Sequence, residues 1–286
     1  MNKLGIHYGS FVTNWSDDQR PLIKKVKSLG FDLLEFGFAY LLDMNSDERK
    51  AFGDEAREAG VTLALSMGLS PSQDIGSSNV DYRRDGLKIL TDTAIAMTEV
   101  GATDCSGIIH GAWNGRIDSY DEKAGYWKNS VITMKEAAKV FENQNVYFNI
   151  EVVNRFENFL INTCNEALKY IDEVGSSNLG IHLDTFHMNI EEDSMVAPII
   201  NAGDKLRYFH IGENNRKFPG LGTMPWKTIF DTLKAADYKR PISMEPFVKP
   251  GGEVGSAVSL YRELMDLSHY EDDIRQSLKF VKAFLK

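Results

Sequence analysis

The sequence predicts an α/β protein that folds as a single (β/α)8 barrel with a C-terminal helical extension, and three observations support this fold class. Short apolar segments alternate with longer amphipathic segments along the whole chain, which is typical of repeated strand–helix units around a parallel sheet. The chain has 286 residues, and a barrel of this class commonly needs ~250. No Gly/Ser/Pro-rich linker or low-complexity tract interrupts the series. We therefore expect one domain over residues 1–286.

Eight segments are candidates for the strands, and several are nearly continuous in apolar residues, as expected for parallel strands covered on both faces. A doubly wound sheet of the Rossmann type would need a Gly-x-Gly-x-x-Gly turn after the first strand, and residues 9–14 do not supply it. Eight units in one series therefore favour a closed barrel. The candidate strands are Leu4–Phe11, Leu33–Phe38, Val61–Met67, Cys105–His110, Val146–Val153, Leu179–His187, Leu206–Ile211 and Pro241–Phe247.

Residues typical of helix ends lie between these strands. Ser16, Ser119 and Thr163 are each followed three residues later by Gln or Glu, which is the spacing of a capping box at a helix start. Glycines also stand where a helix should end before the next strand. These glycines are Gly30, Gly60, Gly101 and Gly175.

Composition excludes several classes of partner. The 32 basic and 41 acidic residues give a net charge of −9, which repels phosphate backbones and anionic membranes, so we expect no nucleic-acid or membrane partner. The richest apolar run, Leu33–Leu42, spans ten residues and contains Glu35, so it is too short to cross a bilayer. Two cysteines, Cys105 and Cys164, make no disulfide framework. With no targeting segment recognisable, we expect a cytoplasmic protein.

Four consecutive strand candidates end in residue types that bind metals: Glu151, Asp184, His210 and Glu245. The intervals between them are 33, 26 and 35 residues, each about one strand–helix unit. Because the C-terminal ends of barrel strands form one mouth, these side chains should converge. Three carboxylates brought together without a cation would repel one another in a medium of low dielectric constant. The sequence therefore predicts a divalent metal site.

The ligand set also limits which metal ions the site is expected to bind. Three oxygen donors and one imidazole suit Mn²⁺, Co²⁺ or Mg²⁺ better than a structural zinc ion, which prefers thiolates. We expect Mn²⁺ first and Co²⁺ next. His182, inside the sixth strand candidate, is expected to be structural, and His7, His110 and Glu35 receive no role from the sequence.

Polar residues in the loops after the predicted ligands suit a polyhydroxylated ligand. Glu157, His187 and Arg216 follow the fifth, sixth and seventh strand candidates and offer a carboxylate, an imidazole and a guanidinium. Trp15 and Trp113 follow the first and fourth candidates, where they can flank a sugar. The alternatives are a salt bridge among Glu157, Arg155 and Arg216 within the loops and ordinary packing of the two tryptophans at the rim.

Four runs of the sequence carry a family resemblance: EVVNRFE at 151–157, LDTFHMNIEED at 183–193, GENNR at 212–216 and MEPFV at 244–248. They resemble the ketose 3-epimerases, that is, the D-tagatose 3-epimerase and D-psicose (D-allulose) 3-epimerase enzymes of the xylose isomerase-like TIM barrel superfamily. The resemblance extends over nearly the whole chain. It implies that the chain folds as a single TIM-barrel domain, which is the fold of this superfamily.

The resemblance implies a metal-dependent isomerase that epimerises C3 of a free ketose such as D-tagatose, D-fructose or L-ribulose through a cis-enediolate. Glu151, Asp184, His210 and Glu245 would hold the ion, and the two glutamates would be the acid–base pair on opposite faces of C3. Glu157, His187 and Arg216 would bind the O1–O2 end. A homodimer or homotetramer is also implied. The sequence departs from the family at positions that face the O4–O6 end: His7, Ser10–Asn14, Ser66 and Ser106–His110.

Three rival functions remain open. An aldose–ketose isomerase or an inosose dehydratase would use related enolate chemistry on the same barrel. An endonuclease IV-like repair enzyme would need more histidines at strand ends and a basic face, which six histidines and a net charge of −9 argue against. A catalytically silent sugar-binding or sensory protein would bind a sugar at the mouth of the barrel but would not catalyse a reaction.

Overall fold

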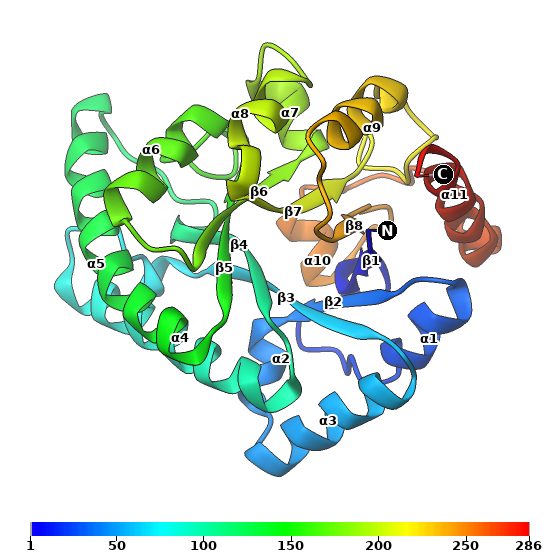
Figure 1. Ribbon diagram of the computed structural model, residues 1–286, viewed down its shortest axis with the longest axis horizontal. Helices are drawn as coiled ribbons and strands as arrows, with labels where there is room; N and C mark the ends of the chain where they lie inside the picture. Colours follow the sequence, from blue (N-terminus) through cyan, green and yellow to red (C-terminus); the bar gives the residue numbers. More distant parts are fainter. Residues whose placement is uncertain (1, 286) are drawn as a thin grey trace.

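The computed structural model describes residues 2–285 and has a closed barrel of eight parallel strands surrounded by helices (Figure 1). The strands follow one another around the barrel in sequence order, and β1 pairs with β8 to close it. This arrangement confirms the predicted (β/α)8 fold class. The strands are β1 (Leu4–His7), β2 (Leu33–Gly37), β3 (Thr62–Leu69), β4 (Asp104–Ala112), β5 (Tyr147–Val152), β6 (Leu179–Asp184), β7 (Leu206–Ile211) and β8 (Ile242–Met244).

Helices connect the strands and cover the outside of the barrel. The α-helices are α1 (Leu22–Leu29), α2 (Phe38–Asp43), α3 (Ser46–Glu58), α4 (Val80–Val100), α5 (Lys123–Gln144), α6 (Cys164–Val174), α7 (Thr185–Glu191), α8 (Ala197–Ala202), α9 (Trp226–Ala235), α10 (Gly252–Ala257) and α11 (Tyr270–Phe284). Short 3-10 helices are η1 (Tyr8–Ser10), η2 (Pro71–Gln73), η3 (Tyr120–Glu122), η4 (Gly203–Lys205) and η5 (Leu267–His269).

Three strands, β1, β6 and β8, end three or four residues earlier than the sequence predicts. At β1 and β6 a polar side chain at the mouth ends the strand. The His7 imidazole accepts the N–H of Gly9, which starts η1 directly after β1. The Asp184 carboxylate accepts the N–H groups of Phe186 and His187, which starts α7 directly after β6. A side chain that caps the next helix fixes where the extended backbone stops. His7 and the predicted ligand Asp184 therefore lie at strand–helix junctions.

The predicted helix ends are largely confirmed. The four glycines have positive φ angles of 95°, 65°, 71° and 77° in chain order, the left-handed geometry typical of a helix C-terminus. Thr163 forms the expected capping box with Glu166, whereas Ser119 caps only the short η3. The prediction at Ser16 is wrong because α1 begins later, at Leu22. The Gln19 side chain instead accepts the N–H of Gly37 at 2.8 Å.

Apolar side chains fill the layer between strands and helices, while the barrel interior carries polar ones. Phe141 of α5 stacks on Phe148 of β5 with ring centroids 3.8 Å apart, and burial of such rings is worth ~1.5–3 kcal/mol each. Inside the barrel, buried Asn149 donates to Ser106 Oγ at 3.2 Å. Tyr208 is also fully buried. The interior below the mouth is therefore packed with side chains, as in other barrels of this architecture.

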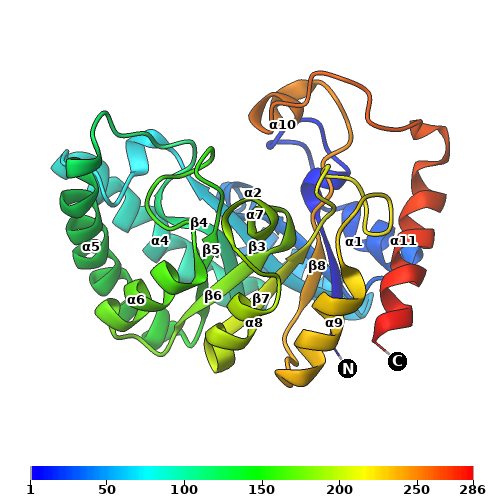
Figure 2. The ribbon, with the colours of Figure 1, turned by 90° about the horizontal axis from the view of Figure 1, so that it is seen from above.

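The C-terminal part of the chain closes over one side of the mouth. In Figure 2, α10 lies above the end of β8, and α11 runs alongside α1. The Val254 N–H donates to the Thr13 carbonyl at 3.0 Å, and the Glu253 carboxylate accepts the N–H of Trp15 at 3.3 Å. These bonds tie α10 to the loop after β1. The expected C-terminal helical extension is α11, whose inner face is buried.

Within residues 2–285, no helix combines the length and the apolar character that a membrane crossing requires. Cys105 and Cys164 are both buried free thiols.

Candidate active site

The four predicted metal ligands come together at the C-terminal end of the barrel. Glu151 lies in β5, Asp184 ends β6, His210 lies in β7 and Glu245 directly follows β8. Asp184 and His210 are register partners on neighbouring strands. His210 Nδ1 lies 3.7 Å from Asp184 Oδ2, 3.5 Å from Glu245 Oε2 and 4.0 Å from Glu151 Oε1. One ligand atom from each of the four residues falls within 4.8 Å of the others.

Two of these atoms have unmet bonding capacity that a cation would satisfy. Asp184 Oδ2 and His210 Nδ1 are buried and have no hydrogen-bond partner. Leaving such atoms unpaired costs ~1–3 kcal/mol each, and more for a charged group. Both are ordinary ligands for a divalent ion. The donor set of three carboxylates and one imidazole therefore fits a divalent metal.

Glu35 orients the histidine ligand from the far side of the barrel. His210 Nε2 lies 2.8 Å from Glu35 Oε2 and 3.0 Å from Glu35 Oε1, and Tyr208 Oη donates to the same carboxylate at 3.2 Å. With the ring proton on Nε2, His210 Nδ1 is left free to bind an ion. This carboxylate–histidine arrangement is typical of metal sites. The only sequence signal was one acidic residue within an apolar run.

The charged groups crowded around Glu151 and Glu245 shift the pKa values of these two carboxyl groups. Burial, reinforced by the negative charge of Glu245, raises the pKa of Glu151 well above its ordinary value. Burial also acts to raise the pKa of Glu245, but His210, His7 and Arg216 outweigh it and lower that pKa to about 2. The two glutamates therefore differ in acidity although they share one cavity.

The three loop residues predicted to bind substrate also meet at the mouth. The Arg216 guanidinium donates to Glu245 Oε2 at 3.0 Å and to Glu157 Oε1 at 3.2 Å. His187 Nδ1 accepts the N–H of Asn154 at 3.2 Å, so its other nitrogen, 3.6 Å from Glu151 Oε1, is available as a donor. The alternative of a loop salt bridge is present only in part: Arg216 pairs with Glu157, but Arg155 pairs with Glu191 outside the cavity.

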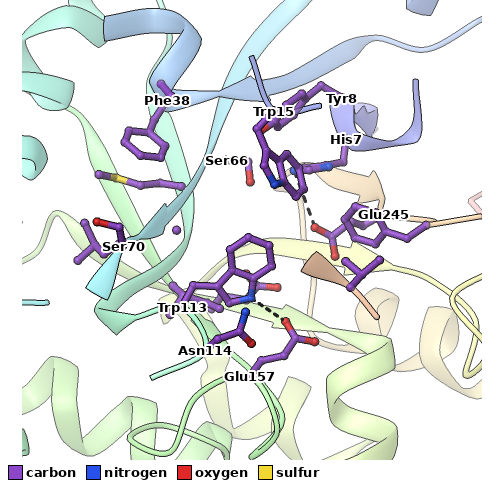
Figure 3. Close-up of a pocket in the computed structure, with 18 of the residues that line it drawn as sticks. His7, Tyr8, Trp15, Phe38, Ser66, Ser70, Trp113, Asn114, Glu157 and Glu245 are labelled. Carbon is purple, nitrogen blue, oxygen red and sulfur yellow. Dashed lines mark hydrogen bonds and ion pairs between the residues drawn. The ribbon is translucent and has the colours of Figure 1, made fainter. Parts of the chain in front are cut away.

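Both predicted tryptophans line the same cavity of about 500 Å³. Their rings meet edge to face with centroids 5.8 Å apart, and Trp113 Nε1 donates to Glu157 Oε2 at 3.3 Å. Figure 3 shows the two rings at the centre of the cavity, with Glu245 and Phe38 on either side in this view. The seven site residues that reach the cavity are Trp15, Trp113, Glu151, Glu157, His187, Arg216 and Glu245.

Sequence reasoning missed Tyr8, Phe38 and Phe247, which line the cavity. His7, which the resemblance places at the O4–O6 end, also lines it, and burial lowers the pKa of His7. His182, expected to be structural, lies 4.0 Å from Glu151 Oε2. It forms with Glu151 and His210 a second group of residues close enough to hold an ion.

Comparison with known proteins places this architecture. Residues 23–284 match the family described as xylose isomerase-like TIM barrel. The D-psicose 3-epimerase of Ruminiclostridium cellulolyticum is 38% identical over 265 residues, which is 92% of this chain and 89% of that protein. The D-psicose 3-epimerase of Agrobacterium fabrum is 34% identical over 99% of both chains.

Solved structures agree with the sequence comparisons. A crystal structure of D-psicose 3-epimerase in the presence of D-fructose has a TM-score of 0.95 and 34% identity over 99% of both chains. D-Psicose 3-epimerase with D-tagatose from Clostridium cellulolyticum H10 has a TM-score of 0.95 and 35% identity, again over 99% of both chains.

Proposed function

Because the chain belongs to the ketose 3-epimerases of the xylose isomerase-like TIM barrel family, we propose that it inverts C3 of a free ketose with Glu151 and Glu245 as the acid–base pair. One observation carries the proposal. Glu151 comes from β5 and Glu245 follows β8, so two carboxylates reach one cavity from separate strands. His210 lies within 4.0 Å of both.

A divalent ion belongs to this proposal. Glu151, Asp184, His210 and Glu245 would hold it, with Mn²⁺ the first expectation and Co²⁺ and Mg²⁺ the alternatives. When bound, such an ion supplies Lewis-acid stabilisation of negative charge on neighbouring substrate oxygens.

The two glutamates divide the proton transfers. One carboxylate removes the proton from C3, and the electron pair left behind forms the C2–C3 double bond of a cis-enediolate. The other glutamate, protonated, returns a proton to C3 from the opposite face, so the configuration inverts. The pair exchange roles in the reverse reaction. A single base on one face would return the proton to the side from which it came.

The loop residues would hold the O1–O2 end of the ketose. Arg216 and His187 are hydrogen-bond donors beside the two glutamates, where they can stabilise charge on the enediolate oxygens. Glu157 is an acceptor for a hydroxyl and is itself held by Arg216 and Trp113. These side chains are positioned by one another before substrate arrives, which reduces the cost of ordering them.

A panel of free ketoses tests the proposal. The protein is loaded with Mn²⁺ and incubated with D-fructose, D-tagatose, L-ribulose and D-xylulose, and the products are separated by chromatography. We expect the C3 epimer of at least one of these ketoses. Aldoses alone would indicate an aldose–ketose isomerase, and dehydrated products alone would indicate a dehydratase; either result contradicts C3 epimerisation.

We also propose that the chain acts as one domain within a homodimer or homotetramer. Light scattering coupled to size-exclusion chromatography measures the assembly directly, and a monomer at micromolar concentration would contradict it.

A further inference from the structure

His7 presents a buried hydrogen-bond donor to the cavity, and the proposed proton transfers do not use it. The residue ends β1, is 3% exposed and lines the cavity beside Glu245. The ring is held between Tyr8 and Phe247, with centroids 4.6 Å and 5.7 Å away. These contacts leave little freedom for the imidazole to rotate.

The backbone of the next turn decides which ring nitrogen carries the proton. His7 Nδ1 accepts the N–H of Gly9 at 3.1 Å, so Nδ1 is unprotonated and the proton is on Nε2. Gly9 permits this close approach, because an added Cβ would lie 2.9 Å from Nδ1 and 2.8 Å from the Phe247 ring. The donor that faces the cavity is therefore Nε2–H.

The carboxylate nearest to this donor is too far away to accept its proton directly. His7 Nε2 lies 3.9 Å from Glu245 Oε1 (Figure 3), beyond hydrogen-bond distance. A hydroxyl oxygen placed ~2.8 Å from both atoms would accept from Nε2–H and donate to the carboxylate, with an angle of about 90° at the oxygen. The gap thus has the size and the polarity for one hydroxyl group of a ligand.

The position of this gap around the barrel indicates which hydroxyl it would take. Glu157, His187 and Arg216 follow β5, β6 and β7, while His7 lies at the end of β1 on the other side of Glu245. A ketose whose O1–O2 end lies against the three loop residues, with C3 between Glu151 and Glu245, extends its next carbon toward β1. That carbon is C4.

We propose that His7 is a specificity-determining residue whose Nε2–H donates to the C4 hydroxyl of the ketose and so discriminates between C4 epimers. This inference rests on the proposed function for the direction in which the sugar lies. In one configuration at C4 the hydroxyl reaches the gap beside Glu245, and in the other it points away and leaves Nε2–H without an acceptor. A donor left unpaired in a cavity weakens binding of the wrong epimer.

D-Fructose and D-tagatose differ only at C4, so the pair tests the assignment. Two substitutions separate the two roles of the ring. H7N keeps an oxygen acceptor near the Nδ1 position for the Gly9 N–H but removes the distal donor. H7Q places an amide N–H near the Nε2 position but gives up the bond to Gly9. Calorimetric affinity for each sugar and kcat/KM are measured on Mn²⁺-loaded protein, and thermal melting checks that each variant is folded.

We expect wild-type protein to bind one epimer ~5–10-fold more tightly, the effect of one hydrogen bond. In H7N the affinity ratio should fall below ~2-fold, through weaker binding of the preferred epimer, while H7Q should retain most of the discrimination. A wild-type ratio near one, an unchanged ratio in H7N, or equal losses in H7N and H7Q would each contradict the assignment. Failure of the wild type to epimerise any of the four ketoses of the panel would contradict the proposed function instead, because affinity and turnover are separate measurements.

Discussion

The two sides of the barrel mouth differ in how much of their polar chemistry is already organised. On the side of β5 to β7, Arg216 bridges Glu157 to Glu245 at the end of β8, and Trp113 in the loop after β4 donates to Glu157. On the side of β1 to β4, the cavity is lined largely by apolar groups such as Phe38 and Ile108. A network of mutually bonded groups fixes the position of whatever it binds, whereas apolar walls discriminate mainly by size.

This contrast suggests that the two sides do different work. The polar side would hold the part of the sugar that reacts, and it must place C3 accurately between the two glutamates. The apolar side would receive the carbons beyond C3, where His7 and Ser66 are among the few polar groups. Substitutions on the two sides should therefore differ in both the size and the kind of their effects.

The largest effect is expected at the acid–base pair. E245Q removes a proton acceptor on one face of C3 and should lower kcat for epimerisation by ~10²–10⁴-fold. Some ketose binding should persist, because Arg216, His187 and Glu157 remain. Ligand affinity measured by calorimetry separates this loss from a loss of binding, and a variant with more than a tenth of wild-type kcat would contradict the assignment.

The next largest effect is expected at Arg216. Its guanidinium donates to two carboxylates at once, and it keeps a positive φ of 60° with its guanidinium carbon 3.9 Å from the Phe186 ring centroid. R216K retains the positive charge but loses the planar guanidinium that donates to two carboxylates at once, so kcat/KM should fall ~10–100-fold. Equal activity of R216K and wild type would show that charge alone is sufficient at this position.

A third effect concerns the metal rather than the sugar. E35Q removes the negative charge behind His210 and should weaken Mn²⁺ affinity ~10–100-fold. Calorimetric titration of metal-free protein measures it without reference to activity. E136Q is a matched control, since Glu136 is exposed on α5, a helix on the outside of the barrel. Equal Mn²⁺ affinities for the two variants would remove Glu35 from the metal site.

The smallest effect is expected on the apolar side. Phe38 begins α2 and is half-buried at the cavity wall. F38L removes part of this wall and should change the preference for D-fructose over D-xylulose by ~10-fold or less. The shift should appear in KM more than in kcat. A collapse of kcat to the level of E245Q would mean that the two sides of the mouth are not separable.

The fold was accessible from the sequence because barrel strands have a strong local signal. β7 begins and ends at the predicted residues, Leu206 and Ile211, since it is apolar and followed by a polar loop. The predictions for β1, β6 and β8 are three or four residues too long, because aromatic residues follow the strand ends. Periodicity does not report that the His7 and Asp184 side chains cap the turns after β1 and β6.

The site was accessible only where its residues recur at strand ends. Asp184 and His210 follow that rule, and the structure brings them together as register partners. Glu35 does not follow it, because its contact with His210 crosses the barrel interior over 175 residues of sequence. His7 is similar, since its orientation depends on Gly9 and Phe247. Contacts that form only when the barrel closes follow no regular spacing in the sequence, so spacing cannot predict them.

The two-base account has one direct test, which is the exchange of the C3 proton in D₂O followed by NMR. Wild-type protein should place solvent deuterium at C3 of the epimer it forms. E245Q, which keeps Glu151, should exchange C3 of one epimer without forming the other, and E151Q should do the same for the opposite epimer. If either variant still forms both epimers at a rate near that of wild type, one glutamate is not a proton-transfer group and the central claim is wrong.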